Sequence, residues 1–489
     1  MSDRTAILEV EVETEQRSVV LTSFSRSLGS GLLALLVASC ATAPAPTTRE
    51  VVETALPETT RVPEVWSAEA EDSGYVDDGW IASFDDQQLE ALVEQALANN
   101  PNLRIAAAQV DRAAGLARVA GSALKPTVSL AGDIAEIGGD SAVSGTSYSA
   151  GIAVSWEADV WGRVRAGATA GEEALAATVA DYEYARQSLA AATAKSWFLA
   201  TESRMLLDLA SETVELYRQL LELVETKHRV GRVSMQDVHL ARADLASSEE
   251  AVRQARSGNE QAVRGLEALL GRYPSAELET ARDLVPVPPP IPIGLPSEIL
   301  ERRPDLIAAE RRVAAAFFKQ EEARLARLPR FTLTAGVGGS DGLSEAIGSL
   351  GAGLFAPLFT GGALAGQLQA ASADQRAAIA AYGQAALRAF QEVETSLSNE
   401  RLFEERQGYL LTVVEENEKA WELAKVQYDV GRVDLLSVVQ MQARWLGARI
   451  SLIRIQSERI SLRVNLHLAL GGSFAAPGRE KAAPAAEEG

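Results

Sequence analysis

Two copies of one tetrapeptide, Val230-Gly231-Arg232-Val233 and Val430-Gly431-Arg432-Val433, decide how the rest of this sequence is read. The two central glycines lie 200 residues apart (431 minus 231), and each copy interrupts a long stretch of helical periodicity. Because glycine tolerates a positive φ, each copy predicts the turn at the tip of a helical hairpin.

Other landmarks repeat at almost the same offset. Asn100-Pro101-Asn102-Leu103 corresponds to Arg303-Pro304-Asp305-Leu306, 203 residues later (304 minus 101). Leu270-Gly271 corresponds to Leu470-Gly471, 200 residues later (471 minus 271). The pattern predicts one architectural unit made twice, as two interlocked halves and not as two independent domains.

Composition limits the function of this chain of 489 residues. It carries 46 basic and 67 acidic residues, a net charge of −21, which argues against nucleic acid and anionic membrane surfaces as partners. Its three histidines (His228, His239 and His467) form no ligand cluster, so we expect no metal and no cofactor. No catalytic constellation appears, and no Lys-Ser/Thr follows Gly361-Gly362 to make a phosphate loop. We therefore expect a protein that is not an enzyme.

The first 39 residues predict a leader and a signal peptide. An apolar run from Leu28 to Ala38 follows Arg26 and ends in small residues before Cys40, the one cysteine of the chain. The run is too short to span a membrane. It resembles a bacterial lipobox, in which Cys40 would be lipidated; an ordinary signal peptide with an incidental cysteine is the alternative. Because residues 1–18 are acidic, we expect translation to begin near Val19–Leu21.

Low-complexity stretches follow the signal peptide, separate the halves and end the chain. Residues 40–65 are rich in Ala, Pro and Thr and predict a flexible tether. Residues 286–296 contain six prolines among Val, Ile, Gly and Leu and predict an extended polyproline strap between a first repeat, 66–285, and a second, 297–471. Residues 472–489 predict a disordered tail.

The periodicity switches from 3.6 to 2 in two places, which predict β-hairpins at about 127–160 and 330–359. Alternate positions are apolar in each strand: Val128, Leu130 and Ile134; Tyr148, Ile152, Val154 and Trp156; Phe331, Leu333 and Val337; Leu350, Leu354 and Leu358. Strands of about 10 residues with this pattern are typical of transmembrane barrels. The edge of a soluble sandwich is the alternative, but four strands are too few for one.

The remaining segments carry heptads, so the helices must pack side by side. Leu209, Leu216, Leu220 and Leu223 follow this spacing before the first tip. As one helix, residues 162–229 would be about 100 Å long, at 1.5 Å per residue. Four strands cannot close a barrel, and open sheet edges are not tolerated in lipid, so we expect oligomers. Three copies would supply twelve strands and a ring of long helices, which together form a conduit.

Several stretches make the sequence resemble the outer membrane factor family, the TolC-like exit ducts, and in particular the NodT-type lipoproteins of RND efflux pumps. They are Ala96–Leu103, Ser155–Arg163, Leu295–Asp305, Leu358–Gly362 and Tyr428–Gly431. The resemblance implies a mostly α fold with membrane β: a homotrimeric, 12-stranded outer-membrane β-barrel continued by a periplasmic α-helical barrel. It implies a lipid anchor in the cell outer membrane, with a periplasmic membrane-fusion adaptor and an inner-membrane RND pump as partners.

The resemblance also assigns roles to the tips. Val230, Gly231, Arg232 and Val233, with Val430, Gly431, Arg432 and Val433, would dock the adaptor. The family's closing link corresponds here to Asp237 and Tyr428, and Asp434, Arg432 and Arg232 could add ion pairs to this periplasmic gate; solvated charges of little energetic value are the alternative. Two aspartates that narrow the pore in TolC correspond here to Ser437 and Gln440, so that acidic ring is absent.

We therefore predict an outer-membrane exit duct of a tripartite RND-type efflux system. Two alternatives stay open: a duct for type I protein secretion beside an ABC transporter, and a periplasmic coiled-coil scaffold protein, which would leave both alternating hairpins unexplained.

Overall fold

The computed structural model describes residues 44–57, 59–60, 62–68, 78–137, 145–340 and 347–474. Cys40, the predicted signal peptide and residues 475–489 of the predicted tail lie outside the described residues. The helices are α2 (Thr48–Ala55), the 3-10 helix η2 (Trp80–Phe84), α3 (Gln87–Asn99), α4 (Pro101–Ser122), α5 (Arg163–Arg229), α6 (Met235–Leu269), α7 (Ile299–Arg302), α8 (Pro304–Leu325), α9 (Ala363–Asp429) and α10 (Leu435–Ala469). The strands are β1 (Thr127–Ile137), β2 (Gly145–Ala158), β3 (Arg330–Ser340) and β4 (Ile347–Phe355).

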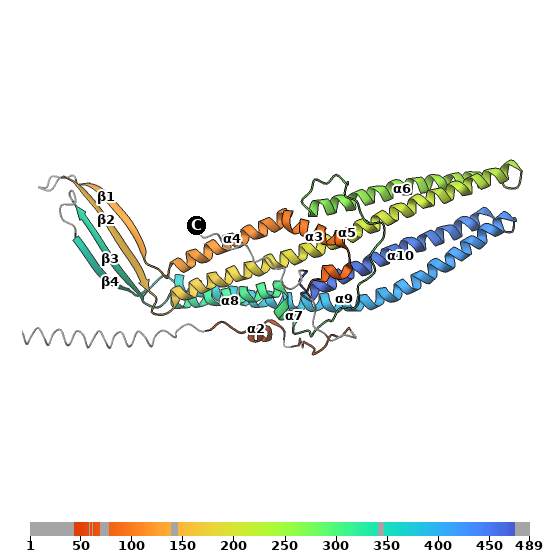
Figure 1. Cartoon of the computed structure of the whole chain (residues 1–489). Coiled ribbons are helices and arrows are strands. Elements are labelled where there is room, and N and C mark those ends of the chain that lie inside the picture. The colour runs from red at the N-terminus through yellow and green to blue at the C-terminus, as the bar shows by residue number, and fades with distance from the viewer. Residues whose placement is uncertain are drawn as a thin grey trace, which may run out of the picture. The chain divides into compact units, whose positions relative to one another are not determined.

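The internal repeat is present in the lengths of the elements. Helices α4 and α8 each have 22 residues, α5 and α9 each have 67, and α6 and α10 each have 35. In each half the order is helix, two strands, long helix, tip and returning helix (Figure 1). The sequence prediction of one unit made twice is confirmed.

The four strands form one antiparallel sheet in the order β1-β2-β3-β4 (Figure 1). The register places Leu130 opposite Ile152, Ile152 opposite Val337, and Ala335 opposite Leu350, so the apolar residues of all four strands share one face. The opposite face carries small and polar residues: Thr127, Ser129, Ala131 and Asp133; Ser149, Gly151, Ala153, Ser155 and Glu157; Thr332, Thr334, Gly336 and Gly338; Ser349, Gly351 and Gly353. The predicted alternation is therefore realised across the whole sheet.

Within the sheet, one close approach of two backbones requires glycine. Gly151 is paired with Gly338, and a Cβ built on Gly151 would lie 3.0 Å from the Val337 carbonyl oxygen and 3.1 Å from the Gly338 Cα. The backbone, not a flexible side chain, fills that space, so no larger residue fits without moving a strand.

The described chain forms two compact units, and each takes segments from both repeats. One contains residues up to Leu56 together with Arg112–Ala177 and Ala309–Tyr382, and therefore the whole sheet. The other contains Pro57–Asp111, Thr178–Ala308 and the chain from Gly383 onward, and therefore both helical tips. The halves are thus interlocked, as the repeat predicted.

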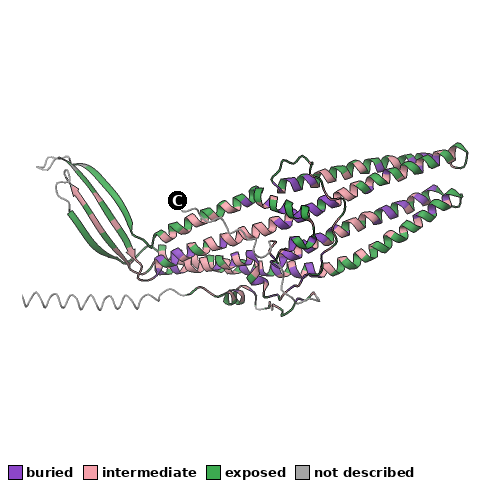
Figure 2. Ribbon diagram, in the orientation of Figure 1, coloured by how far each residue is buried: buried purple, intermediate pink, exposed green. Residues whose placement is uncertain are grey.

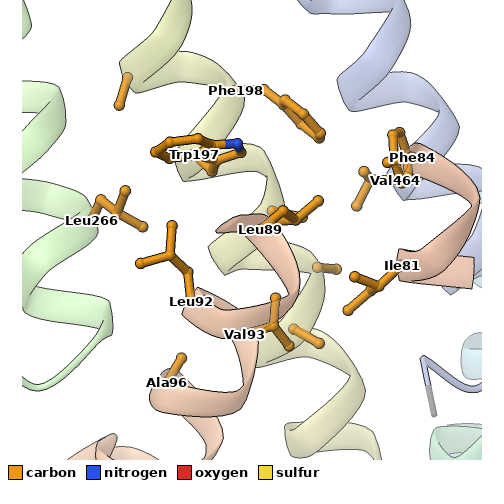
Figure 3. Close-up of a cluster of buried hydrophobic side chains, with 14 of the residues drawn as sticks. Ile81, Phe84, Leu89, Leu92, Val93, Ala96, Trp197, Phe198, Leu266 and Val464 are labelled. Atoms are coloured by element: carbon orange, nitrogen blue, oxygen red, sulfur yellow. The ribbon is translucent and has the colours of Figure 1, made fainter. Parts of the chain in front are cut away.

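In the unit that carries the tips, the short segments before α4 cap a buried cluster (Figure 3). Leu89 and Leu92 of α3 lie beside Trp197 of α5, and Phe84 of η2 packs against Phe198 of the same long helix, with the ring centroids 5.3 Å apart. Each of these side chains is at most 4% exposed. The indole Nε1 of Trp197 donates to Asp86, whose other carboxylate oxygen accepts from the first turn of α3. One carboxylate therefore both caps α3 and anchors it to the long helix.

In each half, the side chain just before the proline that starts α4 or α8 donates a hydrogen bond to the carboxyl end of the returning helix, α6 or α10, but the donor differs between the halves. Asn100 Nδ2 donates to the carbonyl oxygen of Leu269 at 2.8 Å, and Arg303 Nη1 donates to that of Ala469 at 3.0 Å. Arg303 is only 1% exposed. Its charge is balanced by Asp305 and Glu392, each at 2.8 Å. Burial alone would lower the pKa of Arg303, but these two carboxylates raise it above its ordinary value.

The prediction of a flexible tether over residues 40–65 is wrong for Thr48–Ala55, which form α2. Thr47 and Glu50 make a capping box at its start. Val51 is 2% exposed, and the Thr48 hydroxyl donates to Glu310 of α8 at 2.5 Å. Only one residue of this helix, Val51, is buried, so the sequence shows no repeating apolar pattern that would have predicted the helix.

The Pro-rich strap has neither helix nor strand in residues 286–295. Its Ile291 and Ile293 are buried, the guanidinium of Arg463 donates to the Pro289 carbonyl, and Trp66 donates to that of Gly294.

The prediction of a disordered tail over residues 472–489 is wrong for residues 472–474. The Gly472 amide donates to the His467 carbonyl, the Ser473 amide donates to Asp78, and Phe474 lies under the guanidinium of Arg186.

Burial follows the pattern expected of the elements (Figure 2). The strands are largely exposed on both faces, whereas the buried positions of the long helices face their neighbours. None of the described helices combines the length and the apolar character that crossing a membrane requires.

Candidate functional site

Both tips are glycine turns that end one helix and start the next. Gly231 and Gly431 have φ of 75° and 76°, and the amides of Arg232 and Arg432 bond back to the carbonyls of residues 227 and 427. Val230 and Val430 are each 67% exposed. Each tip therefore presents one exposed valine beside its glycine turn.

The two aspartates predicted to form part of a gate cap their own helices. Ser234 and Asp237 form a capping box at the start of α6, in which Asp237 accepts from the Ser234 amide and hydroxyl at 2.9 and 2.8 Å. Asp434 caps α10 and accepts from the Ser437 amide and hydroxyl at 2.9 and 2.6 Å. These bonds from Ser437 lower the pKa of Asp434. Each carboxylate therefore has a structural role at a helix N-terminus.

Asp237 and Tyr428, which the resemblance assigns to the closing link, are not hydrogen-bonded to each other within this chain. Tyr428 is 5% exposed, and its hydroxyl is buried with no hydrogen-bond partner in the described chain. Burial, and then the charges of Asp237 and Asp429, raise the pKa of Tyr428. Tyr428 is thus a neutral, unpartnered donor close enough to Asp237 to respond to its charge.

The tip arginines make no ion pair within the described part of the chain. None of the ion pairs between described residues includes Arg232 or Arg432. Their guanidinium groups therefore remain available to residues outside this chain.

A different residue, Lys227 near the end of α5, joins the two hairpins. Its Nζ donates to the Tyr428 carbonyl oxygen at 2.8 Å, lies 3.3 Å from Asp429 Oδ1, and is 4.0 Å from the centre of the Tyr428 ring. Sequence analysis missed this residue. Its signal was an asymmetry between the repeats, because residue 427 at the corresponding position is glutamine.

An aromatic pair lies further up the same hairpins. Trp421 of α9 and Trp445 of α10 stack with their centroids 4.5 Å apart. Lys425 lies over the first ring at 3.6 Å and Arg449 over the second at 5.0 Å. Arg449 also pairs with Glu212 of α5 at 2.8 Å. The stack is therefore flanked by two cations, one of which ties it to the other hairpin.

The hydrophobic core of the hairpins is shared by all four long helices. Val224 of α5, Val238 of α6, Tyr428 of α9 and Leu435 of α10 belong to one buried cluster. The heptad prediction was wrong at Leu223, which is 36% exposed, whereas its neighbour Val224 is fully buried. A strict seven-residue count drifts around a straight helix of 3.6 residues per turn, which accounts for the slip.

Nothing in the described residues resembles a metal centre. Within the described ranges, no group of three or more His, Cys, Asp or Glu residues is placed to hold a metal ion. The tips and the exposed apolar face of the sheet are the two features on which a functional assignment can rest.

Comparisons with known proteins agree on one family. The family model described as "Outer membrane efflux protein" matches residues 92–272 and 295–472. The toluene efflux pump outer membrane protein TtgC of Pseudomonas putida is 31% identical over 82% of this chain and 87% of its own length. The pyoverdine export outer membrane protein OpmQ of Pseudomonas aeruginosa is 29% identical over 81% and 87%.

A solved structure agrees in both sequence and fold. That of the outer-membrane channel OprN is 27% identical and has a TM-score of 0.78, covering 86% of this chain and 99% of its own.

Proposed function

Since the chain belongs to the outer membrane efflux protein family, we propose that it is the outer-membrane exit duct of a tripartite RND-type efflux pump. Its task is to let small molecules delivered from the periplasmic side pass outward. Energy comes from the pump, since a duct of this kind performs no chemistry of its own.

The observation that carries this proposal is the sheet. Leu130 is 79% exposed, Ile134 75% and Leu350 89%, all on its apolar face. A protein surrounded by water rarely exposes such a continuous apolar surface, whereas the hydrocarbon core of a membrane solvates it favourably. The other face, made mostly of Gly, Ala, Ser and Thr with Asp133 and Glu157, suits the wall of a water-filled passage.

The free strand edges support a trimer. Strands β1 and β4 each have one neighbour in the sheet, so each leaves an edge to be paired. Three copies of four strands make twelve, with β4 of one copy antiparallel to β1 of the next, which closes the barrel without an exposed edge. The long helices of the same copies then continue the passage on the periplasmic side.

The helical tips and Cys40 have further roles in the proposed duct. We assign the exposed Val230 and Val430 turns to adaptor docking, and the neighbouring Asp237, Tyr428 and Asp434 to the gate. Lipidation at Cys40 would anchor the protein in the outer membrane.

Single-channel conductance of the purified, detergent-extracted protein in planar bilayers tests the proposal. We expect a small, mostly closed conductance in the wild type that increases in Asp237→Ala. Because Asp237 also caps α6, Asp237→Ala removes about 1 kcal/mol of capping as well as a charge. Ser234→Ala is the matched control, since it removes the cap and keeps the carboxylate.

The proposal is supported if the protein conducts and the conductance of Asp237→Ala is larger than that of Ser234→Ala. If properly inserted trimers show no conductance in any variant, the proposal is refuted. Equal effects of Asp237→Ala and Ser234→Ala would retain the duct but remove Asp237 from the gate.

A further inference from the structure

The last three residues of β2 are held in the sheet by one neighbour only. The pairs between β1 and β2 stop at Thr127 opposite Ser155, but β2 continues for three residues to Ala158. Those three residues are paired on the other side, with β3, where Ala158 lies opposite Phe331. The second neighbour of β2 therefore keeps its end in the strand conformation.

The internal repeat relates the two hairpins of the sheet residue by residue. An offset of 203 converts Thr127 to Arg330 (330 minus 127), and an offset of 200 converts Ser155 to Phe355 (355 minus 155). Arg330 lies opposite Phe355, and the pairs between β3 and β4 stop there. The two hairpins therefore have the same register and stop pairing at equivalent positions.

Strand β4 ends where its pairing with β3 ends, whereas β2 does not end at the equivalent point. Residues 356–358 correspond to residues 156–158 of β2, yet they are neither helix nor strand. Leu358 is 96% exposed, and Phe359 is 92% exposed. This segment lacks the second neighbour that holds its equivalent in the first half.

A second copy of this chain would supply that neighbour. Adding 200 to a residue of β2 and subtracting 203 from its partner in β3 converts each observed pair into a pair between β4 and β1 of the next copy. The conversion places Ala356 opposite Leu130, and Leu358 opposite Val128. Val128 and Leu130 are 70% and 79% exposed, so apolar side chains are available on both edges.

The proline within the segment is compatible with this pairing. Pro357 has no amide proton, so it must lie at a pair without hydrogen bonds. The close approach of Gly151 and Gly338 marks a pair of that kind, and the two kinds alternate along an antiparallel ladder. Glu157, the equivalent of Pro357, lies six residues beyond Gly151 and therefore belongs to a pair of the same kind. A slip of one residue would place Pro357 at a hydrogen-bonded pair and turn every side chain to the other face.

Helix α4 has exposed apolar residues at positions that are occupied by contacts in α8. Glu322 of α8 lies 3.9 Å from Arg163 of α5, measured from Oε1 to Nη1. Its equivalent in α4 is Val119 (322 minus 203), which is 67% exposed. Leu116, the equivalent of Lys319, is 53% exposed. The first half thus has apolar residues without cover both at its strand edge and on α4, as expected of a surface that another copy covers.

We propose that residues 356–358 complete β4 by pairing with residues 128–130 of a second copy, so that Leu358 lies opposite Val128. This inference rests on the proposed function as a trimeric duct and adds the register in which its chains join. The interaction surface is the segment after Phe355, and its partner is β1 of the next copy.

Disulfide formation in the detergent-extracted protein tests the register. Opposite residues of an antiparallel ladder have Cα atoms about 4.5–5.5 Å apart, which a disulfide can bridge, whereas diagonal neighbours are about 7–8 Å apart. Oxidation with copper-phenanthroline should link chains that carry both Ala356→Cys and Leu130→Cys. Ala356→Cys combined with Val128→Cys or with Gly132→Cys is the matched control and should link at least about ten times more slowly.

The links report on contacts between chains, because β1 and β4 of one chain are three strand spacings apart, about 14 Å. Each single cysteine variant, which retains Cys40, shows whether Cys40 itself forms links.

Amide hydrogen exchange tests the extension of the strand. In the trimer, the amides of Ala356 and Leu358 should exchange at least about 100-fold more slowly than in an unstructured peptide. Their equivalents in β2, Trp156 and Ala158, are the matched control and should be protected to a similar degree. Exchange of Ala356 and Leu358 at the rate of an unstructured peptide, beside protected Trp156 and Ala158, would overturn the proposal.

The outcomes distinguish this pairing from the duct itself. If the wild type conducts but a control pair links faster than Ala356→Cys with Leu130→Cys, the register is refuted and the duct stands. If the wild type conducts and no pair links chains, β4 does not meet β1 of another copy, so the pairing is refuted and the duct stands. If the proposed pair links fastest and both amides are protected, but inserted protein does not conduct, the pairing stands and the duct is refuted.

Discussion

Replacing Arg303 by methionine should loosen the end of α10 while leaving the end of α6 intact. The guanidinium is 1% exposed and bonds to Asp305, Glu392 and the Ala469 carbonyl. Breaking a fully buried pair costs about 3–5 kcal/mol. Here the carboxylates of Asp305 and Glu392 are 24% and 42% exposed and can be rehydrated, so we expect about 2–3 kcal/mol.

Hydrogen exchange of the amides of Leu470, Gly471 and Gly472 measures this loss locally, because all three bond back into the last turn of α10. A loss of 2–3 kcal/mol predicts an increase in exchange rate of about 30- to 150-fold, at 1.4 kcal/mol for each factor of ten. The control is Asn100→Ala, which removes one neutral bond of about 1 kcal/mol from the equivalent junction and also the bonds that Asn100 Oδ1 accepts from the amides of Asn102 and Leu103 at the start of α4. It should accelerate exchange at residues 270–272 by about fivefold and at Asn102 and Leu103, and leave residues 470–472 unchanged.

The first half also supplies a rescue. Arg303→Asn with Asp305→Asn copies the Asn-Pro-Asn sequence of residues 100–102 into the second half. It should recover most of the protection, because a neutral donor again faces the Ala469 carbonyl and one unpaired carboxylate is removed. Unchanged exchange at residues 470–472 in Arg303→Met would refute the reasoning, as would acceleration no larger than that of Asn100→Ala.

Three other predictions concern the sheet, the acid sensitivity and the N-terminal helix. Gly151→Ala should cost about 1–3 kcal/mol and reduce the heat-resistant, fast-migrating trimer band on gels, whereas Gly353→Ala should not, since its nearest contact would be an ordinary 3.9 Å. Burial, and then the charge of Arg463, lower the pKa of His467 from 6.5 to about 3, so the unfolded chain binds more protons between these values. Stability should then fall by at most about 1.4 kcal/mol per pH unit as pH drops below 6.5, and His467→Phe should flatten this slope in thermal unfolding scans; an unchanged slope would exclude His467 as the cause. Val51→Asp should undock α2, seen as amide exchange of residues 48–55 at the rate of an unstructured peptide; protection retained there would show that Val51 does not hold the helix.

The sequence by itself determined the architecture of the halves, because periodicity and turn residues are local signals. The repeated Val-Gly-Arg-Val placed both tips, because each turn requires a positive φ that glycine adopts without strain and helical periodicity resumes on both sides of it. The alternation of Ile152 and its neighbours fixed which face of each strand is apolar, because the side-chain period of a strand is two. The long helix expected over residues 162–229 is observed as α5, Arg163–Arg229.

Tertiary structure alone decided which side chains meet across the halves. The sequence placed Asp237 close to the first tip. Its carboxylate accepts hydrogen bonds from Ser234, three residues away at the N-terminus of α6, and none from Tyr428. Lys227 could not be selected from the sequence, since its partners lie about 200 residues along the chain and depend on the rotation of α5 about its axis. A rotation of that kind also separates buried Val224 from exposed Leu223. Local pattern fixes the elements, whereas the packing of one helix against another fixes the residues that hold them together.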